Sequence, residues 1–173
     1  MRWQSEDACP GAVMKTLLAG RLSRARALPW PAKKRAVHAG VWLLCVGIGL
    51  RLVGFARTQR LLERLVSAPR DDPIRLDRER ADRDVERDRA AVARAAHLVP
   101  FGTCLTRALT LWALLRRRGI ETVLKVGVRK HGDALAAHAW LESDGVPIVT
   151  PAEVAGYAAF REPLIPRSRK ARS

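Results

Sequence analysis

Residues 104–119 read Cys-Leu-Thr-Arg-Ala-Leu-Thr-Leu-Trp-Ala-Leu-Leu-Arg-Arg-Arg-Gly, and this stretch decides the fold of the second half of the chain. Its apolar side chains recur at helical spacing, which predicts a helix that is buried on most sides. Thr103 can cap the start of this helix, and Gly119 is a fitting stop at its end. Cys104 is therefore expected in the first turn, where the helix dipole favours the thiolate form.

A short antiparallel meander is expected after this helix. Alternating apolar residues predict a strand at 122–129, and the turn residues at 130–133 predict a hairpin. The return strand is expected at 135–142, and a turn at 143–145 leads to a third strand at 146–150. The second half of the chain should thus be a helix packed on an antiparallel sheet.

His138 lies in the return strand, within Ala-His-Ala-Trp at 137–140. An imidazole close to a helix-borne thiol can serve as its base and proton shuttle. We therefore predict Cys104 as a nucleophile and His138 as its general base and acid. Trp140 has the same strand parity as His138 and is expected to wall the substrate cleft, with simple core packing as the alternative.

The chain carries a large excess of positive charge, with 32 Lys and Arg against 17 Asp and Glu and a net charge of +15 over 173 residues. Such an excess fits either a nucleic acid or an acidic partner or peptide substrate. Aromatic residues make up only 5%, and no strand interleaves them with basic residues in the way that proteins stack bases. We therefore expect no nucleic-acid partner.

One structural domain is expected from this length. Its regions are a disordered leader at 1–13, a helical N-terminal region at 14–97, a catalytic core at 98–160 and a frayed basic tail at 161–173. Within the helical region, periodicity predicts helices at 14–28, at 32–66 as one long or two consecutive helices, and at 76–96. Alternating charges predict that the helix at 76–96 is a solvated surface helix with ion pairs.

The cysteines Cys9, Cys45 and Cys104 are far apart, and none of them has the spacing of a metal site. Free thiols in a reducing, cytoplasmic setting are expected, with no metal, and Cys45 should be a small buried side chain. The apolar run at 41–55 contains Arg51 and is shorter than the roughly twenty residues that span a bilayer. A buried or interfacial helix is expected there, and peripheral membrane contact stays open.

The motifs around these residues resemble a known family. They are residues 104–120, Val-Gly-Val-Arg at 126–129, Ala-His-Ala-Trp-Leu-Glu at 137–142 and Asp-Gly at 144–145. They resemble the transglutaminase-like leader peptidase of lasso peptide biosynthesis, in its stand-alone cysteine protease form. The resemblance implies an α+β, papain/transglutaminase-like fold, in which N-terminal helices precede a catalytic helix packed on an antiparallel sheet.

The resemblance also implies a function and partners. The enzyme would be a cysteine peptidase that cleaves the leader from a ribosomally made precursor peptide. A leader-recognition partner protein would deliver the peptide, and an asparagine-synthetase-like cyclase would then form the macrolactam. Carried over by position, Cys104 is the nucleophile, His138 the base, and the backbone N–H of Cys104 part of the oxyanion hole, with no cofactor required.

The identity of the third catalytic residue, the one that would orient His138, is left open by the sequence. The family usually places an aspartate about twelve residues after the histidine, and this chain has Thr150 there. A hydroxyl can accept a hydrogen bond from imidazole, but it does not stabilise imidazolium as a carboxylate does. Asp144 is the nearest carboxylate, although its turn sequence favours a structural role, and Glu142 shares the strand face of His138.

Two other functions are possible, one because Thr150 replaces the usual aspartate and one because of the thioester intermediate. The chain could be a non-catalytic scaffold of the lasso peptide maturation complex, which the threonine at position 150 motivates. It could also be a transglutaminase-type acyl transferase, because the same thioester intermediate serves transfer to an amine and transfer to water.

Overall fold

The computed structural model describes residues 30–66, 78–131 and 134–165. The leader expected at 1–13 and the helix expected at 14–28 lie outside the described residues, as does most of the expected basic tail. The first residues described, up to Lys34, belong to a separate unit. The packing and the pocket described below belong to the unit that begins at Arg35.

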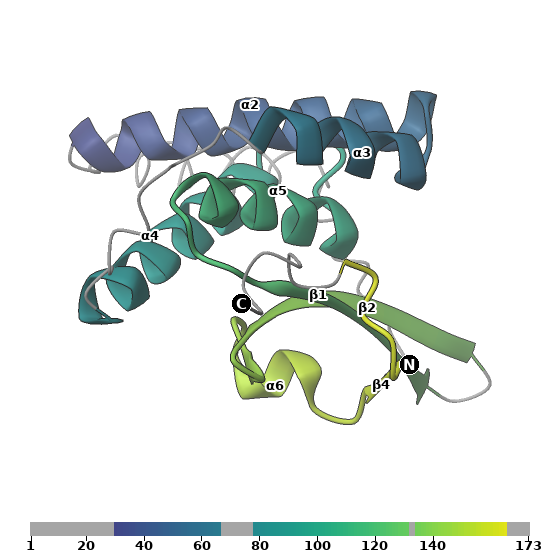
Figure 1. Cartoon of the computed structure of the whole chain (residues 1–173). Helices are drawn as coiled ribbons and strands as arrows, with labels where there is room; N and C mark the ends of the chain where they lie inside the picture. Colours follow the sequence, from purple (N-terminus) through teal and green to yellow (C-terminus); the bar gives the residue numbers. More distant parts are fainter. Residues whose placement is uncertain (1–29, 67–77, 132–133, 166–173) are drawn as a thin grey trace, which may run out of the picture. The chain divides into compact units, whose positions relative to one another are not determined.

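In the described part of the chain, four helices precede the sheet (Figure 1). They are α2 (Trp30–Leu52), α3 (Phe55–Val66), α4 (Arg78–Ala96) and α5 (Cys104–Arg117). Gly54 separates α2 from α3 with a φ of 78°, a left-handed conformation that glycine adopts at little cost. The apolar stretch expected at 32–66 is therefore two consecutive helices.

Helix α5 has the buried position that its sequence predicts. Leu109, Trp112 and Leu115 are at most 1% exposed, and each contributes roughly 1.5–3 kcal/mol by burial. Figure 1 shows α3 on one side of α5 and the strands on the other, in agreement with the contacts of this helix. Thr103 caps α5 by accepting a hydrogen bond from the Thr106 N–H at 3.3 Å.

The strands form one antiparallel sheet in the order β3-β2-β1-β4. Its members are β1 (Val123–His131), β2 (Ala134–Ser143), β3 (Val146–Pro147) and β4 (Ala158–Ala159). The register of β1 and β2 places Gly127 directly opposite His138. The hairpin expected from the sequence is confirmed by this pairing.

The third strand is shorter than expected. It ends at Pro147, and Thr150 is the N-cap of a short helix, α6 (Pro151–Val154). Proline has no N–H and a φ that suits the first turn of a helix, so Pro151 favours a helix start at this point. The prediction that a strand continues to Thr150 is therefore wrong.

Two residues of the predicted frayed tail pair with β1. Ile165 is 2% exposed and accepts a hydrogen bond from the Leu124 N–H at 3.1 Å, while the Leu164 N–H donates to the Leu124 carbonyl at 2.8 Å. The edge of β1 thereby gains backbone partners at residues 164 and 165.

Helix α4 is only partly the solvated helix that its charges predict. Its exposed face has the expected ion pairs between near neighbours, such as Arg89 with Glu86 at 2.8 Å. Its C-terminal half is buried, because small residues there allow close packing; the buried residues are Ala91, Val92, Ala95 and Ala96. Asp88, only 3% exposed, accepts two hydrogen bonds from Arg118 at 2.7 and 2.9 Å, which joins α4 to the end of α5.

Helix α2 buries one face and exposes apolar residues on another. Its buried residues are Ala39, Leu43, Val46 and Gly47. Other apolar residues of the helix are exposed; they include Val37, Val41, Leu44, Ile48 and Leu52. Cys45 is exposed as well, so the prediction of a buried thiol is wrong. With 23 residues, α2 is the one described helix that is long and apolar enough to cross a membrane by length and composition.

Candidate active site

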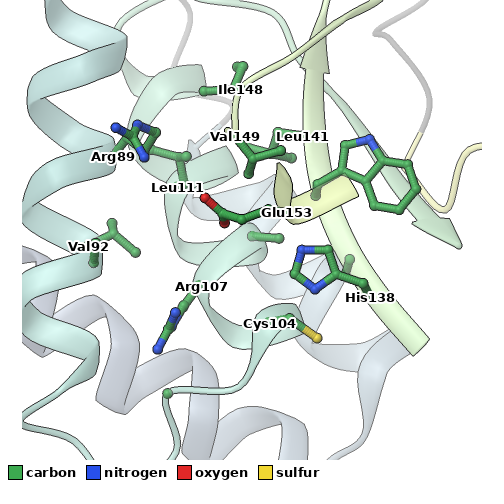
Figure 2. A pocket seen from close by; sticks show the side chains of 15 residues that line it. Arg89, Val92, Cys104, Arg107, Leu111, His138, Leu141, Ile148, Val149 and Glu153 are labelled. Atoms are coloured by element: carbon green, nitrogen blue, oxygen red, sulfur yellow. The ribbon is translucent and has the colours of Figure 1, made fainter. Parts of the chain in front are cut away.

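A pocket of about 450 Å³ lies where α4, α5 and β2 meet the segment that follows β3. Cys104 and His138 both line it. Figure 2 shows the Cys104 sulfur and the His138 imidazole facing each other. The two residues that the sequence pairs as nucleophile and base thus reach one pocket from different elements.

Cys104 is a half-buried free thiol and the first residue of α5. The first N–H groups of an α-helix have no acceptor within the helix. The Thr103 cap serves the Thr106 N–H, which leaves the N–H of Cys104 outside this capping bond. A donor at this position can stabilise negative charge that develops beside the sulfur.

His138 lies between two aromatic rings. The Trp140 ring stacks on it at 6.1 Å between centroids and 19° between planes, and the Tyr157 ring lies 5.4 Å away. Trp140, 4% exposed, donates its indole N–H to Glu142 at 3.0 Å. Trp140 also lines the pocket.

The electrostatics of His138 favour a neutral imidazole. Burial lowers the pKa of His138, Arg107 and Arg129 lower it further, and the negative charge of Glu153 opposes them. The Nε2 atom of His138 is buried and has no hydrogen-bond partner among residues 30–66, 78–131 and 134–165. A neutral imidazole has one ring nitrogen that can accept a proton from the thiol and pass it on, and a second that can donate its N–H to another group.

None of the three residues predicted as a possible third member lines the pocket. Glu142 accepts the Trp140 hydrogen bond. Asp144 is an exposed turn residue with a φ of 51°. Thr150 is exposed and begins α6.

Glu153 is a carboxylate in the pocket that the sequence analysis missed. Its Oε1 accepts hydrogen bonds from the Thr150 hydroxyl at 2.7 Å and the Thr150 N–H at 3.3 Å. A signal was present, because Thr-Pro-Ala-Glu at 150–153 has the spacing at which a glutamate reaches back to the N-cap of its helix. Tyr157 was missed too, and nothing in its local sequence indicates its position.

Two arginines give the pocket a basic side. Arg107 lies one helical turn after Cys104, and its Nε is buried without a partner in the described chain. Arg89, on α4, lines the pocket while paired with Glu86. Over the described residues, no three His, Cys, Asp or Glu side chains gather in a way that could hold a metal ion.

Comparison with known proteins agrees with this geometry. A family model described as the transglutaminase-like superfamily matches residues 42–162, which is more than half of the chain and includes both Cys104 and His138. No curated protein and no solved structure matches the chain. The observed order, helices followed by an antiparallel sheet, confirms the α+β fold expected for such a protein.

Proposed function

The chain belongs to the transglutaminase-like superfamily, and on that premise we propose that it is a cysteine peptidase that removes the leader from a lasso precursor peptide. Cysteine hydrolases and acyl transferases are common in this superfamily. The observation that carries the proposal is that Cys104, at the start of a helix, and His138, on a strand, line one pocket. The choice of substrate is supported by the motifs between Cys104 and Gly145.

The proposed reaction has two steps. His138 takes the proton of Cys104, and the thiolate attacks the carbonyl carbon at the leader–core junction. The helix N-terminus stabilises the resulting oxyanion, and His138 gives its proton to the departing amine of the core peptide. Water, deprotonated by His138, then attacks the thioester, which releases the leader as a carboxylic acid and restores the thiol.

The basic character of the chain fits peptide delivery by partners. A net charge of +15 favours association with an acidic leader or an acidic recognition protein. We include the leader-recognition protein and the asparagine-synthetase-like cyclase in the proposal as partners. Binding through such charges should weaken as salt is added.

The test combines the purified protein, its recognition partner and the precursor peptide, and follows leader release by mass spectrometry. Cys104→Ala and His138→Ala should each reduce release by about a thousandfold or more. Cys45→Ala is the matched thiol control, because Cys45 is exposed on α2. His38→Ala is the matched histidine control, because His38 is exposed on α2, outside the pocket, where it accepts a hydrogen bond from the Trp42 indole N–H at 3.1 Å. Normal cleavage by Cys104→Ala would overturn the proposal.

The scaffold function is the second candidate, because Thr150 stands where the family has an aspartate. It predicts that the wild-type protein binds the precursor and its partners but never cleaves. The same experiment therefore separates the two functions. Repeating it with an added primary amine tests acyl transfer, since an amide on the leader would then replace the acid.

A further inference from the structure

We propose that Glu153 is the carboxylate that positions His138, and that Thr150 positions the Glu153 side chain through hydrogen bonds. The inference rests on the proposed pairing of Cys104 with His138, and it does not depend on the identity of the substrate. In the family that this chain resembles, the carboxylate stands at position 150. Here it would come from three residues further on, at the end of the first turn of α6.

Position is the first argument. Glu153 and His138 line the same pocket, and Figure 2 shows the imidazole with Cys104 on one side and Glu153 on the other. The buried Nε2 of His138 has no partner among the residues described. A ring nitrogen that is buried without a partner is costly, and a carboxylate within reach removes that cost.

Charge is the second argument. The charged and titratable groups around His138 are Cys104 and Arg107 on α5, Arg89 on α4, Arg129 on β1, and Glu153 and Tyr157 after β3. Burial has the largest influence on the pKa of His138 and lowers it, and Glu153 is the anion that raises it, against Arg107 and Arg129. Glu153 is therefore placed to stabilise the imidazolium that forms when Cys104 gives up its proton.

The hydrogen bonds of Thr150 are the third argument. Its hydroxyl and its N–H both donate to Oε1 of Glu153, which leaves Oε2 for a further donor. In the structure Glu153 bonds to Thr150 rather than to His138, and its side chain is exposed. Pairing with His138 requires this exposed side chain to rotate, with Thr150 as its anchor, so that Oε2 reaches the ring N–H of His138. The proton itself moves only between Cys104 and His138.

The test measures the pKa of His138 by NMR titration without any substrate. Glu153→Gln removes the anion, so the pKa of His138 should fall, and leader cleavage should slow by about a hundredfold in kcat with little change in KM. Thr150→Asp in the Glu153→Gln background should recover both, because it returns a carboxylate to position 150. Glu162→Gln, an exposed glutamate outside the pocket, is the matched control.

The rate of alkylation of Cys104 is a second measurement, and it does not require the precursor peptide. In a Cys9→Ser, Cys45→Ser background, the rate of reaction with iodoacetamide against pH should change with Glu153→Gln and recover with Thr150→Asp. The inference would be overturned if the pKa of His138 were unchanged in Glu153→Gln. It would also be overturned if Glu142→Gln, rather than Glu153→Gln, slowed leader cleavage. If leader cleavage fails in every variant while the titration shifts as expected, only the proposed substrate is overturned.

Discussion

The two walls of the pocket are built in different ways. Cys104 and His138 belong to a wall made of a buried helix and a hairpin whose strands pair at nine positions. Glu153 belongs to a second wall, the segment from β3 to β4, which also carries Thr150 and Tyr157 outside the pocket lining and consists of a four-residue helix between two strands of two residues each. The first wall sets the positions of the Cys104 and His138 side chains. The second wall carries Glu153, whose negative charge raises the pKa of His138.

The difference indicates how such a site can change. A buried helix tolerates few substitutions, because each alteration of volume is felt by its neighbours. The exposed segment around α6 has few packing constraints. The proposed carboxylate at position 153 instead of 150 would therefore leave the places of Cys104 and His138 unchanged.

Among the substitutions that compare the two walls, Gly127→Ala should have the largest effect, because it changes the packing of the first wall beside His138. A Cβ at position 127 would lie 2.8 Å from the Trp140 ring and 2.9 Å from the Ala158 carbonyl oxygen. Such overpacking costs roughly 1–3 kcal/mol, and it would push Trp140 away from His138. We expect a lower free energy of unfolding by denaturant titration and leader cleavage slower by at least about tenfold.

The same substitution on the second wall is the comparison. Gly156 has a φ of 76°, and its Cβ would meet the flexible Arg129 side chain at 3.2 Å. Gly156→Ala should cost about 1–2 kcal/mol through backbone strain alone and should leave Trp140 in place. Equal losses of cleavage in the two variants would contradict the distinction between the walls.

Asp88→Asn should have the next largest effect, on stability alone. It breaks the buried pair with Arg118 that joins α4 to the end of α5. Removing one partner of a buried ion pair costs about 3–5 kcal/mol, and because Arg118 is partly exposed we expect about 2 kcal/mol. Glu79→Gln, which breaks the exposed pair with Arg83, is the control and should be nearly neutral. A thermal melt of the three proteins checks this, and similar midpoints for all three would contradict it.

The pH dependence of cleavage should give the smallest effect. His138 must be neutral to act as a base, and burial lowers its pKa, so the neutral form persists below the usual range. The acid limb of kcat/KM should therefore lie below about pH 6.5, the ordinary value for histidine. A limb at or above that value would show that Glu153 outweighs burial and the arginines.

The sequence predicted the first wall well and the second poorly. Helical periodicity and strand alternation are local signals, and they were enough to place Cys104, His138 and Trp140. The second wall depends on where β3 ends, and a two-residue strand has no periodicity to recognise. Thr150 was therefore expected on a strand, and Glu153 was not considered.

The buried face of α2 could not be predicted from its apolar residues, because they occur on more than one side of the helix. Val41 and Ile48 are exposed, whereas Leu43 and Val46 are buried. Gly47, on the buried face, lets Phe101 approach closely, since a Cβ there would lie 2.8 Å from Phe101. Which face is buried is decided by the neighbouring element, and this information is absent from the local sequence.

The β1–β2 hairpin has a practical consequence. Its inner half is buried at Leu124 and Leu141, whereas Lys130, Ala134 and Leu135 at its outer end are exposed. Residues added between His131 and Ala134 would fall outside the paired positions and would not shift the register that keeps His138 opposite Gly127. This end of the hairpin is therefore where a fluorophore, an affinity tag or a tether to a partner can be attached while the pocket keeps its geometry.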